Sequence, residues 1–214
     1  MTQWWAQRGT IEAPAAAEFE RFASVPQVLA ISGSASALSA QQIEAALAAG
    51  FVDIPVDARA IVAASDWQQQ FETLARRTIA VLRAGHSVMM HTARGNRDGR
   101  IQALVEALVS GGVEPAQAQL EGGRLLGQRL GGLADRVLHA VPLQRLLLSG
   151  GDTSSLITQQ LAPQALQVAA RLAPGAPLCR VLSPSPHLAS LQIALKGGQM
   201  GGPDYFVKAL RGTT

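Results

Sequence analysis

The chain has 214 residues, of which 48% are hydrophobic and 15% are charged, and its formal net charge is +3. This length and composition predict a folded chain of one domain or two small ones and exclude an intrinsically disordered protein. The positive charge comes from arginines scattered along the chain, with only two lysines, which argues against a nucleic-acid-binding surface.

The ends and the cysteine content indicate where the protein works. The single cysteine, Cys179, excludes a disulfide within the chain and suits a reducing compartment. The first residues contain no basic segment followed by an apolar run, and no apolar run is long enough to cross a bilayer. We therefore expect a cytoplasmic protein without a membrane partner. Residues 1–26 lack a clear periodicity but include Trp4 and Trp5, and we interpret them as an N-terminal lead or the remnant of an interdomain connection.

Apolar runs and amphipathic segments alternate along the single domain that we expect over residues 27–214. The apolar runs predict strands at residues 28–31, 51–55, 87–91, 146–148, 167–170, 178–182 and 191–195. Apolar residues at helical spacing predict helices at about residues 39–49, 71–82, 101–109, 115–140 and 203–210. Strands that alternate with helices predict an α/β fold, a three-layer αβα arrangement with a mostly parallel sheet.

Two details of the predicted helices can be tested directly. Ser39 with Gln42, and Ser65 with Gln68, match the capping box of a helix start. The segment 115–140 contains five glycines, each of which costs about 1 kcal/mol against alanine in a helix interior. So many glycines predict either close packing of this helix on the sheet or a break within it.

Residues 146–157 form the central stretch of the sequence. Leu146-Leu147-Leu148 predicts a buried strand, and Ser149-Gly150-Gly151-Asp152-Thr153-Ser154 then leads into a new apolar segment. The glycines let the backbone turn sharply and approach a ligand. Asp152, Thr153 and Ser154 suit the N-cap of a helix, whose free N–H groups attract phosphate. The stretch predicts a phosphate-binding turn, with an ordinary strand-to-helix turn as the alternative.

Two further loops rich in glycine or serine follow predicted strands, at residues 32–34 and 196–202. The carboxyl ends of parallel strands lie together, so the three loops are expected to converge on one ligand. Backbone amides, hydroxyls and the lysine of the third loop, Lys196, suit the phosphates of a nucleotide. Neither a Walker A sequence nor G-x-G-x-x-G is present.

The ordered loops resemble a known family. Ser32-Gly33-Ser34 resembles the start of the nucleotide-binding domain of the four-carbon acid sugar kinases, and Gly150-Gly151-Asp152-Thr153-Ser154 resembles that family's Gly-Gly-acid-Thr-Ser loop. Ala194-Leu195-Lys196-Gly197-Gly198, with the residues up to Phe206, is similar to its closing segment. The resemblance covers about residues 25–212 and only the C-terminal half of such kinases.

This resemblance implies a kinase that uses ATP and Mg²⁺ to phosphorylate four-carbon sugar acids such as threonate or 3-oxo-tetronate. It also implies that an N-terminal acid-sugar-binding domain, or a partner chain carrying it, is needed for activity. A stand-alone nucleotide-binding module without catalysis is the alternative, and an unrelated α/β enzyme acting on a small phosphorylated metabolite is a third. The oligomeric state is left open, a homodimer included.

The resemblance places nucleotide contacts in all three loops. The expected contacts are Ser34, Gly150, Gly151, Asp152, Thr153, Ser154, Lys196, Gly197 and Gly198. Asp152 could hold a magnesium-bound water or be a plain N-cap. Lys196 could contact a phosphate or be a solvated lysine at a strand end, and a local turn bond is the alternative for Ser34. The catalytic base is not predicted.

Other polar residues carry weaker predictions. Arg94, Arg97 and Arg100, between the third strand and the next helix, could reach an anionic partner, with a solvated surface as the alternative. The four histidines, His86, His91, His139 and His187, show no metal-ligand spacing, so we expect structural roles for them.

Overall fold

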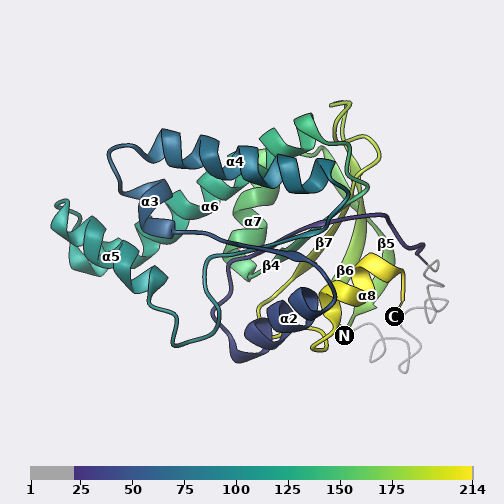
Figure 1. Ribbon diagram of the computed structural model, residues 1–214, viewed down its shortest axis with the longest axis horizontal. Coiled ribbons are helices and arrows are strands. Elements are labelled where there is room, and N and C mark those ends of the chain that lie inside the picture. Colours follow the sequence, from purple (N-terminus) through teal and green to yellow (C-terminus); the bar gives the residue numbers. More distant parts are fainter. Residues whose placement is uncertain (1–21, 214) are drawn as a thin grey trace, which may run out of the picture.

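The computed structural model describes residues 22–213, so the predictions for residues 1–21 lie outside the described part, and the domain boundary at residue 27 stays a prediction. A seven-stranded sheet lies between two layers of helices (Figure 1). The strands are β1 (Leu29–Ser32), β2 (Val52–Pro55), β3 (Val88–His91), β4 (Arg145–Ser149), β5 (Ala165–Ala173), β6 (Ala176–Leu182) and β7 (Gln192–Lys196). The helices are α2 (Ala37–Ala48), α3 (Ala58–Val62), α4 (Trp67–Arg83), α5 (Arg100–Ser110), α6 (Pro115–Ala140), α7 (Gly151–Leu161) and α8 (Tyr205–Arg211).

The sheet is mostly parallel, which confirms the predicted three-layer α/β class. Its strand order is β2-β3-β1-β4-β7-β6-β5. Strands β2, β3, β1, β4 and β7 pair in parallel, whereas β6 pairs antiparallel with both β7 and β5. Within the described residues no helix is both long and apolar enough to cross a membrane.

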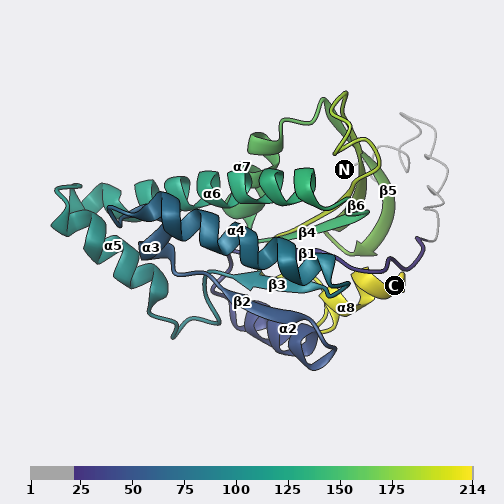
Figure 2. The same ribbon diagram turned by 45° about the horizontal axis from the view of Figure 1, so that its top comes forward.

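Both faces of the sheet are buried, which explains why the strand sequences do not alternate. In β1, Leu29 and Ile31 belong to the core under α3–α7, whereas Ala30 belongs to the core under α2 and α8. The same division separates Leu147 of β4 from its two neighbours. Figure 2 shows α2 and α8 on one side of the sheet and α4, α6 and α7 on the other.

The glycines of α6 that have close neighbours face other helices and not the sheet, so the predicted helix–sheet packing is wrong. Helix α6 runs unbroken for 26 residues. A Cβ atom on Gly127 would lie 2.4 Å from Leu156 Cδ1, and one on Gly131 would lie 2.5 Å from Gln160 Cβ. Because Leu156 and Gln160 belong to α7, these two glycines let α6 and α7 approach closely.

Both predicted capping boxes are wrong. Helix α2 begins at Ala37, before Ser39, and its N-cap is Ser36, whose side chain accepts a hydrogen bond from Ser39 N. Helix α4 begins at Trp67 after Asp66, with no side-chain capping bond. The short helix α3 was not predicted from the sequence, because it contains only five residues.

Candidate functional site

The three loops predicted to converge start side by side. Strands β1, β4 and β7 are neighbours, and their last residues, Ser32, Ser149 and Lys196, lie in register. Gly33 N donates to Ser149 O over 2.8 Å, and Gly150 N donates to Lys196 O over 3.0 Å. The sheet register therefore places the loops at one edge, as expected for the carboxyl ends of parallel strands.

Glycines allow these loops to touch. A Cβ atom on Gly33 would lie 1.9 Å from Thr153 Oγ1, and one on Gly198 would lie 2.1 Å from Ser34 Oγ. Gly150 has a φ of +106°, a conformation that side chains disfavour. A side chain at Gly33 would push the first loop away from α7, because Thr153 Cβ lies only 2.6 Å from the added atom, and a side chain at Gly198 would force Ser34 Oγ to move.

Polar side chains of α2 hold the loop after β7. Gly198 O accepts hydrogen bonds from Ser36 Oγ over 2.8 Å and from Ser39 Oγ over 2.9 Å. Gln42 Nε2 donates to the carbonyls of Met200 and Gly202. The spacing of Ser39 and Gln42 predicted a capping box, and this function was therefore missed from the sequence. The available signal was that both polar residues lie on the helix face that also carries Ile43, which is buried.

Helix α7 begins immediately after β4. Its N-cap is Gly150, so Asp152, Thr153 and Ser154 lie inside the first turn, and the N-cap role predicted for them is wrong. The N–H groups of the first residues of a helix have no acceptor within it. In α7 these groups belong to Gly151 and the two residues after it, because Ser154 N already bonds to Gly150 O. The side chain of Asp152 is exposed at this positive end of the helix dipole.

A cleft of about 490 Å³ opens between α7 and β7. Four of the predicted contacts line it: Gly151, Ser154, Lys196 and Gly197. The cleft is also lined by Ser155, Thr158, Gln159, Gly175, Pro177 and Leu195. Ser34, Gly150, Thr153 and Gly198 take part in the loop contacts described above, and Asp152 lies exposed in the first turn of α7. Ser34 Oγ also accepts a local bond from Ser36 N.

Lys196 is buried, which contradicts the solvated alternative. Its side chain is 3% exposed, and Nζ donates to Gly197 O over 3.2 Å. Nζ also lies 5.6 Å and 5.9 Å from the ring centroids of Tyr205 and Phe206. Burial lowers the pKa of Lys196 to about 8. Among residues 22–213 no carboxylate pairs with this ammonium group.

Ser154 is the second buried polar group of the cleft. Its side chain is 6% exposed, and its Oγ has no hydrogen-bond partner within the described part of the chain. A buried polar atom without a partner costs about 1–3 kcal/mol, so a ligand that bonds to it is favoured. The ammonium of Lys196, the hydroxyl of Ser154 and the N–H groups of α7 together form a set of donors suited to an anion.

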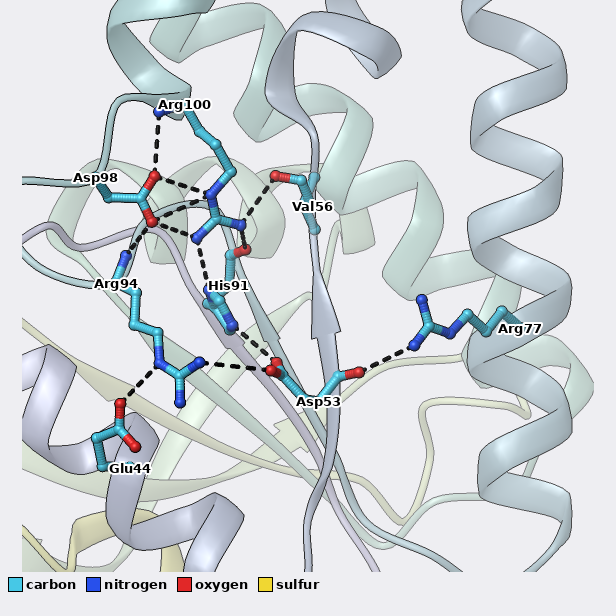
Figure 3. A network of polar contacts seen from close by, with 8 residues as sticks. All are labelled: Glu44, Asp53, Val56, Arg77, His91, Arg94, Asp98 and Arg100. Carbon is cyan, nitrogen blue, oxygen red and sulfur yellow. Dashed lines mark hydrogen bonds and ion pairs between the residues drawn. The ribbon is translucent and has the colours of Figure 1, made fainter.

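A separate polar network lies at the ends of β2 and β3 (Figure 3). Arg100 bonds to Asp98 over 2.6 Å and to His91 Nδ1 over 2.9 Å, and it also reaches Val56 O. Arg94 pairs with Glu44 over 2.8 Å. Both arginines are therefore occupied by partners within the chain, while Arg97 is exposed.

The network fixes the state of His91. Arg100 can only donate, so His91 Nδ1 accepts, and Nε2–H donates to Asp53 Oδ1 over 2.9 Å. Burial lowers the pKa of His91, although the Asp53 bond opposes this effect. The bonds from Arg100 hold the pKa of Asp98 well below its usual range. A second cleft, of about 510 Å³, lies beside Asp98 and Arg100.

Comparison with known families gives the classification. The family described as "Nucleotide-binding C-terminal domain" matches residues 29–206, which include all five parallel strands and the three loops. The chain belongs to this family. The resemblance to the C-terminal domain of the four-carbon acid sugar kinases is thereby confirmed.

Kinases are among the relatives of this nucleotide-binding C-terminal domain. The 3-oxo-isoapionate kinase of Paraburkholderia graminis is 33% identical over 202 residues, which are 94% of this chain and 42% of that protein. The 3-oxo-tetronate kinase of Cupriavidus necator is 39% identical over 102 residues, 46% of this chain and 22% of that protein. The D-threonate kinase of Salmonella typhimurium is 25% identical, covering 86% of this chain and 41% of that protein. The chain thus spans less than half the length of these relatives.

Solved structures share the fold of this family member. A protein from Salmonella typhimurium described as a putative tRNA synthase matches with a TM-score of 0.63 at 21% identity, covering 91% of this chain and 42% of its own. A Haemophilus influenzae protein matches with a TM-score of 0.63 at 20% identity, over 96% and 44% of the two chains. A Bordetella bronchiseptica domain described as a domain-swapped dimer with bound citrate has a TM-score of 0.63 at 19% identity, over 89% and 41%.

Proposed function

We propose that this chain is the ATP-binding domain of a kinase that phosphorylates four-carbon sugar acids such as threonate or 3-oxo-tetronate. The observation that carries the proposal is a pair of buried groups in the cleft at the start of α7: Lys196 Nζ, which pairs with no carboxylate of the described residues, and Ser154 Oγ, which has no hydrogen-bond partner among them. A buried ammonium without a carboxylate is costly, and phosphate oxygens would compensate that cost. The kinases named above are consistent with this assignment.

The loops after β4 and β7 each have a defined task in this proposal. The N–H groups of Gly151 and the residues after it contact phosphate oxygens, and Lys196 adds a positive charge. The exposed carboxylate of Asp152 would hold a water of Mg²⁺, because this ion keeps several waters and bridges phosphates. ATP supplies the phosphoryl group. The chain contributes positioning and electrostatic stabilisation, and the contacts of Ser36, Ser39 and Gln42 keep the loop after β7 in place.

The sugar acid is expected to bind elsewhere. The chain spans 42% of the length of the isoapionate kinase that it matches. We propose that an N-terminal acid-sugar-binding domain, or a partner chain that carries it, completes the active site. The chain by itself then acts as a nucleotide-binding module, which is the second candidate function.

Calorimetric titration with ATP and a non-hydrolysable analogue, with and without Mg²⁺, tests the nucleotide site. Lys196→Met should weaken ATP binding by about 10- to 100-fold, since hydrogen bonds to charged groups contribute about 1.5–3 kcal/mol. Lys208→Met is the matched control, because Lys208 is half-exposed on α8 and pairs with Asp204. Absence of ATP binding to the wild-type chain, or equal affinity of Lys196→Met, would refute the proposal.

The same titration with threonate tests the division of the active site. The isolated chain should bind ATP but not threonate, and it should not transfer phosphate. Threonate binding or phosphorylation by this chain alone would contradict the requirement for a second domain and leave the ATP site unaffected.

A further inference from the structure

One carboxylate and two imidazoles form a cluster on the far side of the molecule from the three loops. Asp135 and His139 lie in the last turns of α6, and His187 lies in the connection between β6 and β7. Because α6 leads into β4 and this connection leads into β7, the cluster lies near the amino ends of two parallel strands. The end of α6 lies beside the β6–β7 connection in Figures 1 and 2. The candidate nucleotide site is at the opposite edge of the sheet.

The distances within this cluster match those around a single metal ion. His187 Nε2 lies 3.0 Å from Asp135 Oδ1, and His139 Nδ1 lies 3.5 Å from Asp135 Oδ2. One potential ligand atom from each of the three residues lies within 4.8 Å of the other two. A tetrahedral Zn²⁺ with ligands at about 2.0–2.1 Å holds them about 3.3 Å apart. Side-chain rotations that keep the backbone in place would bring the three atoms around one ion.

Helix α6 holds two of these ligands side by side. Asp135 and His139 are four residues apart on one helix, which places them on the same face. His139 Nδ1 and His187 Nε2 both face the Asp135 carboxylate, while the two rings stack with centroids 3.5 Å apart and planes 29° apart. A tetrahedral ion would hold the two ring centroids about 5 Å apart, so the rings must turn away from each other when it binds. Their side chains are 57% and 16% exposed, so an ion can enter and a water can complete its coordination.

The donor set selects the class of ion. Two imidazole nitrogens and one carboxylate oxygen suit Zn²⁺ and similar divalent transition metals, whereas Mg²⁺ and Ca²⁺ prefer oxygen ligands only. We propose that Asp135, His139 and His187 bind one divalent transition metal ion of this class. Metal binding needs His139 Nδ1 and His187 Nε2 without a proton, so each bound ring carries its proton on the other nitrogen. The ion joins α6 to the β6–β7 connection.

The competing explanation is that the three residues only form hydrogen bonds that stabilise the fold. His139 Nδ1 lies 2.9 Å from Asp135 O, and His187 Nε2 lies 3.0 Å from Asp135 Oδ1. Metal binding replaces both contacts. If the cluster has only this structural role, the chain should not bind one Zn²⁺ at these residues.

The test is calorimetric titration of ZnCl₂ into the full chain without a polyhistidine tag, with Co²⁺ absorption as a report on tetrahedral geometry. We expect one Zn²⁺ per chain, and at least about tenfold weaker binding for His139→Asn and for His187→Asn, because even groups that only support a ligand change metal affinity by that much. His86→Asn is the matched control, because His86 is exposed and lies outside the cluster.

A further variant distinguishes metal binding from a purely structural role of the hydrogen bonds. Asp135→Asn keeps the shape and a hydrogen-bond acceptor but removes the charge, so zinc binding should fall while the folded circular dichroism spectrum is kept. Absence of saturable Zn²⁺ binding to the wild type, or equal affinity in the His139 and His187 variants, would overturn the proposal. ATP titrations are independent of this outcome, since the two sites lie at opposite edges of the sheet.

Discussion

Glycine-to-alanine substitutions along α6 should change stability in opposite directions, depending on what faces each glycine. A Cβ atom on Gly123 would meet nothing within 4 Å outside the backbone of its own helix. The same atom would lie 2.8 Å from Leu156 Cβ at Gly127 and 2.5 Å from Gln160 Cβ at Gly131. These neighbouring Cβ atoms are fixed to the α7 backbone. A rotamer change cannot move them, so α7 itself must shift.

The magnitudes follow from two opposing effects. Replacing glycine by alanine in a helix interior gains about 1 kcal/mol from propensity. Overpacking a close contact costs about 1–3 kcal/mol. We therefore expect Gly123→Ala to stabilise the fold by about 1 kcal/mol. Gly127→Ala and Gly131→Ala should destabilise it by up to about 2 kcal/mol, since the packing cost exceeds the gain.

Urea unfolding followed by circular dichroism measures all three variants under one condition. For a domain of this size 1 kcal/mol corresponds to about 2–4 °C in Tm, so thermal scans provide a second check. If Gly127→Ala and Gly131→Ala stabilised the protein as Gly123→Ala does, the close approach of α6 and α7 would be wrong.

Two other predictions concern buried cations. Arg145 is 1% exposed and donates to Gln192 Oε1, Ala209 O and Ala23 O. Arg145→Met should lower the free energy of unfolding by about 3 kcal/mol in urea titrations, because three bonds from a charged donor are lost and the buried Ala209 O is left without this partner. An unchanged midpoint would contradict this. Burial lowers the pKa of Lys196 from 10.5 to about 8 in the folded chain, so the unfolded chain binds more protons between these values. The free energy of unfolding, measured without nucleotide, should therefore rise with pH across that window in the wild type but not in Lys196→Met. Parallel pH profiles of the two proteins would count against the burial of this ammonium.

The sequence determined the layered α/β fold, because its signals are local. Apolar runs without alternation, such as Leu146-Leu147-Leu148, indicated strands buried on both faces, and the structure divides their side chains between two cores. The convergence of the three loops was also predictable, since parallel strands end at one edge. Which residues of these loops contact a nucleotide stays a prediction.

Only the tertiary structure decided what several residues face. The spacing of Ser39 and Gln42 matched a capping box, yet their side chains bond to carbonyls of the loop after β7, about 160 positions away. The glycines of α6 pointed equally to the sheet or to a break, and the structure placed Gly127 and Gly131 against α7. His187 meets Asp135 across 52 positions, so no spacing rule could pair them. Sequence periodicity encodes which face of an element is buried, but the partner of that face depends on how the elements pack.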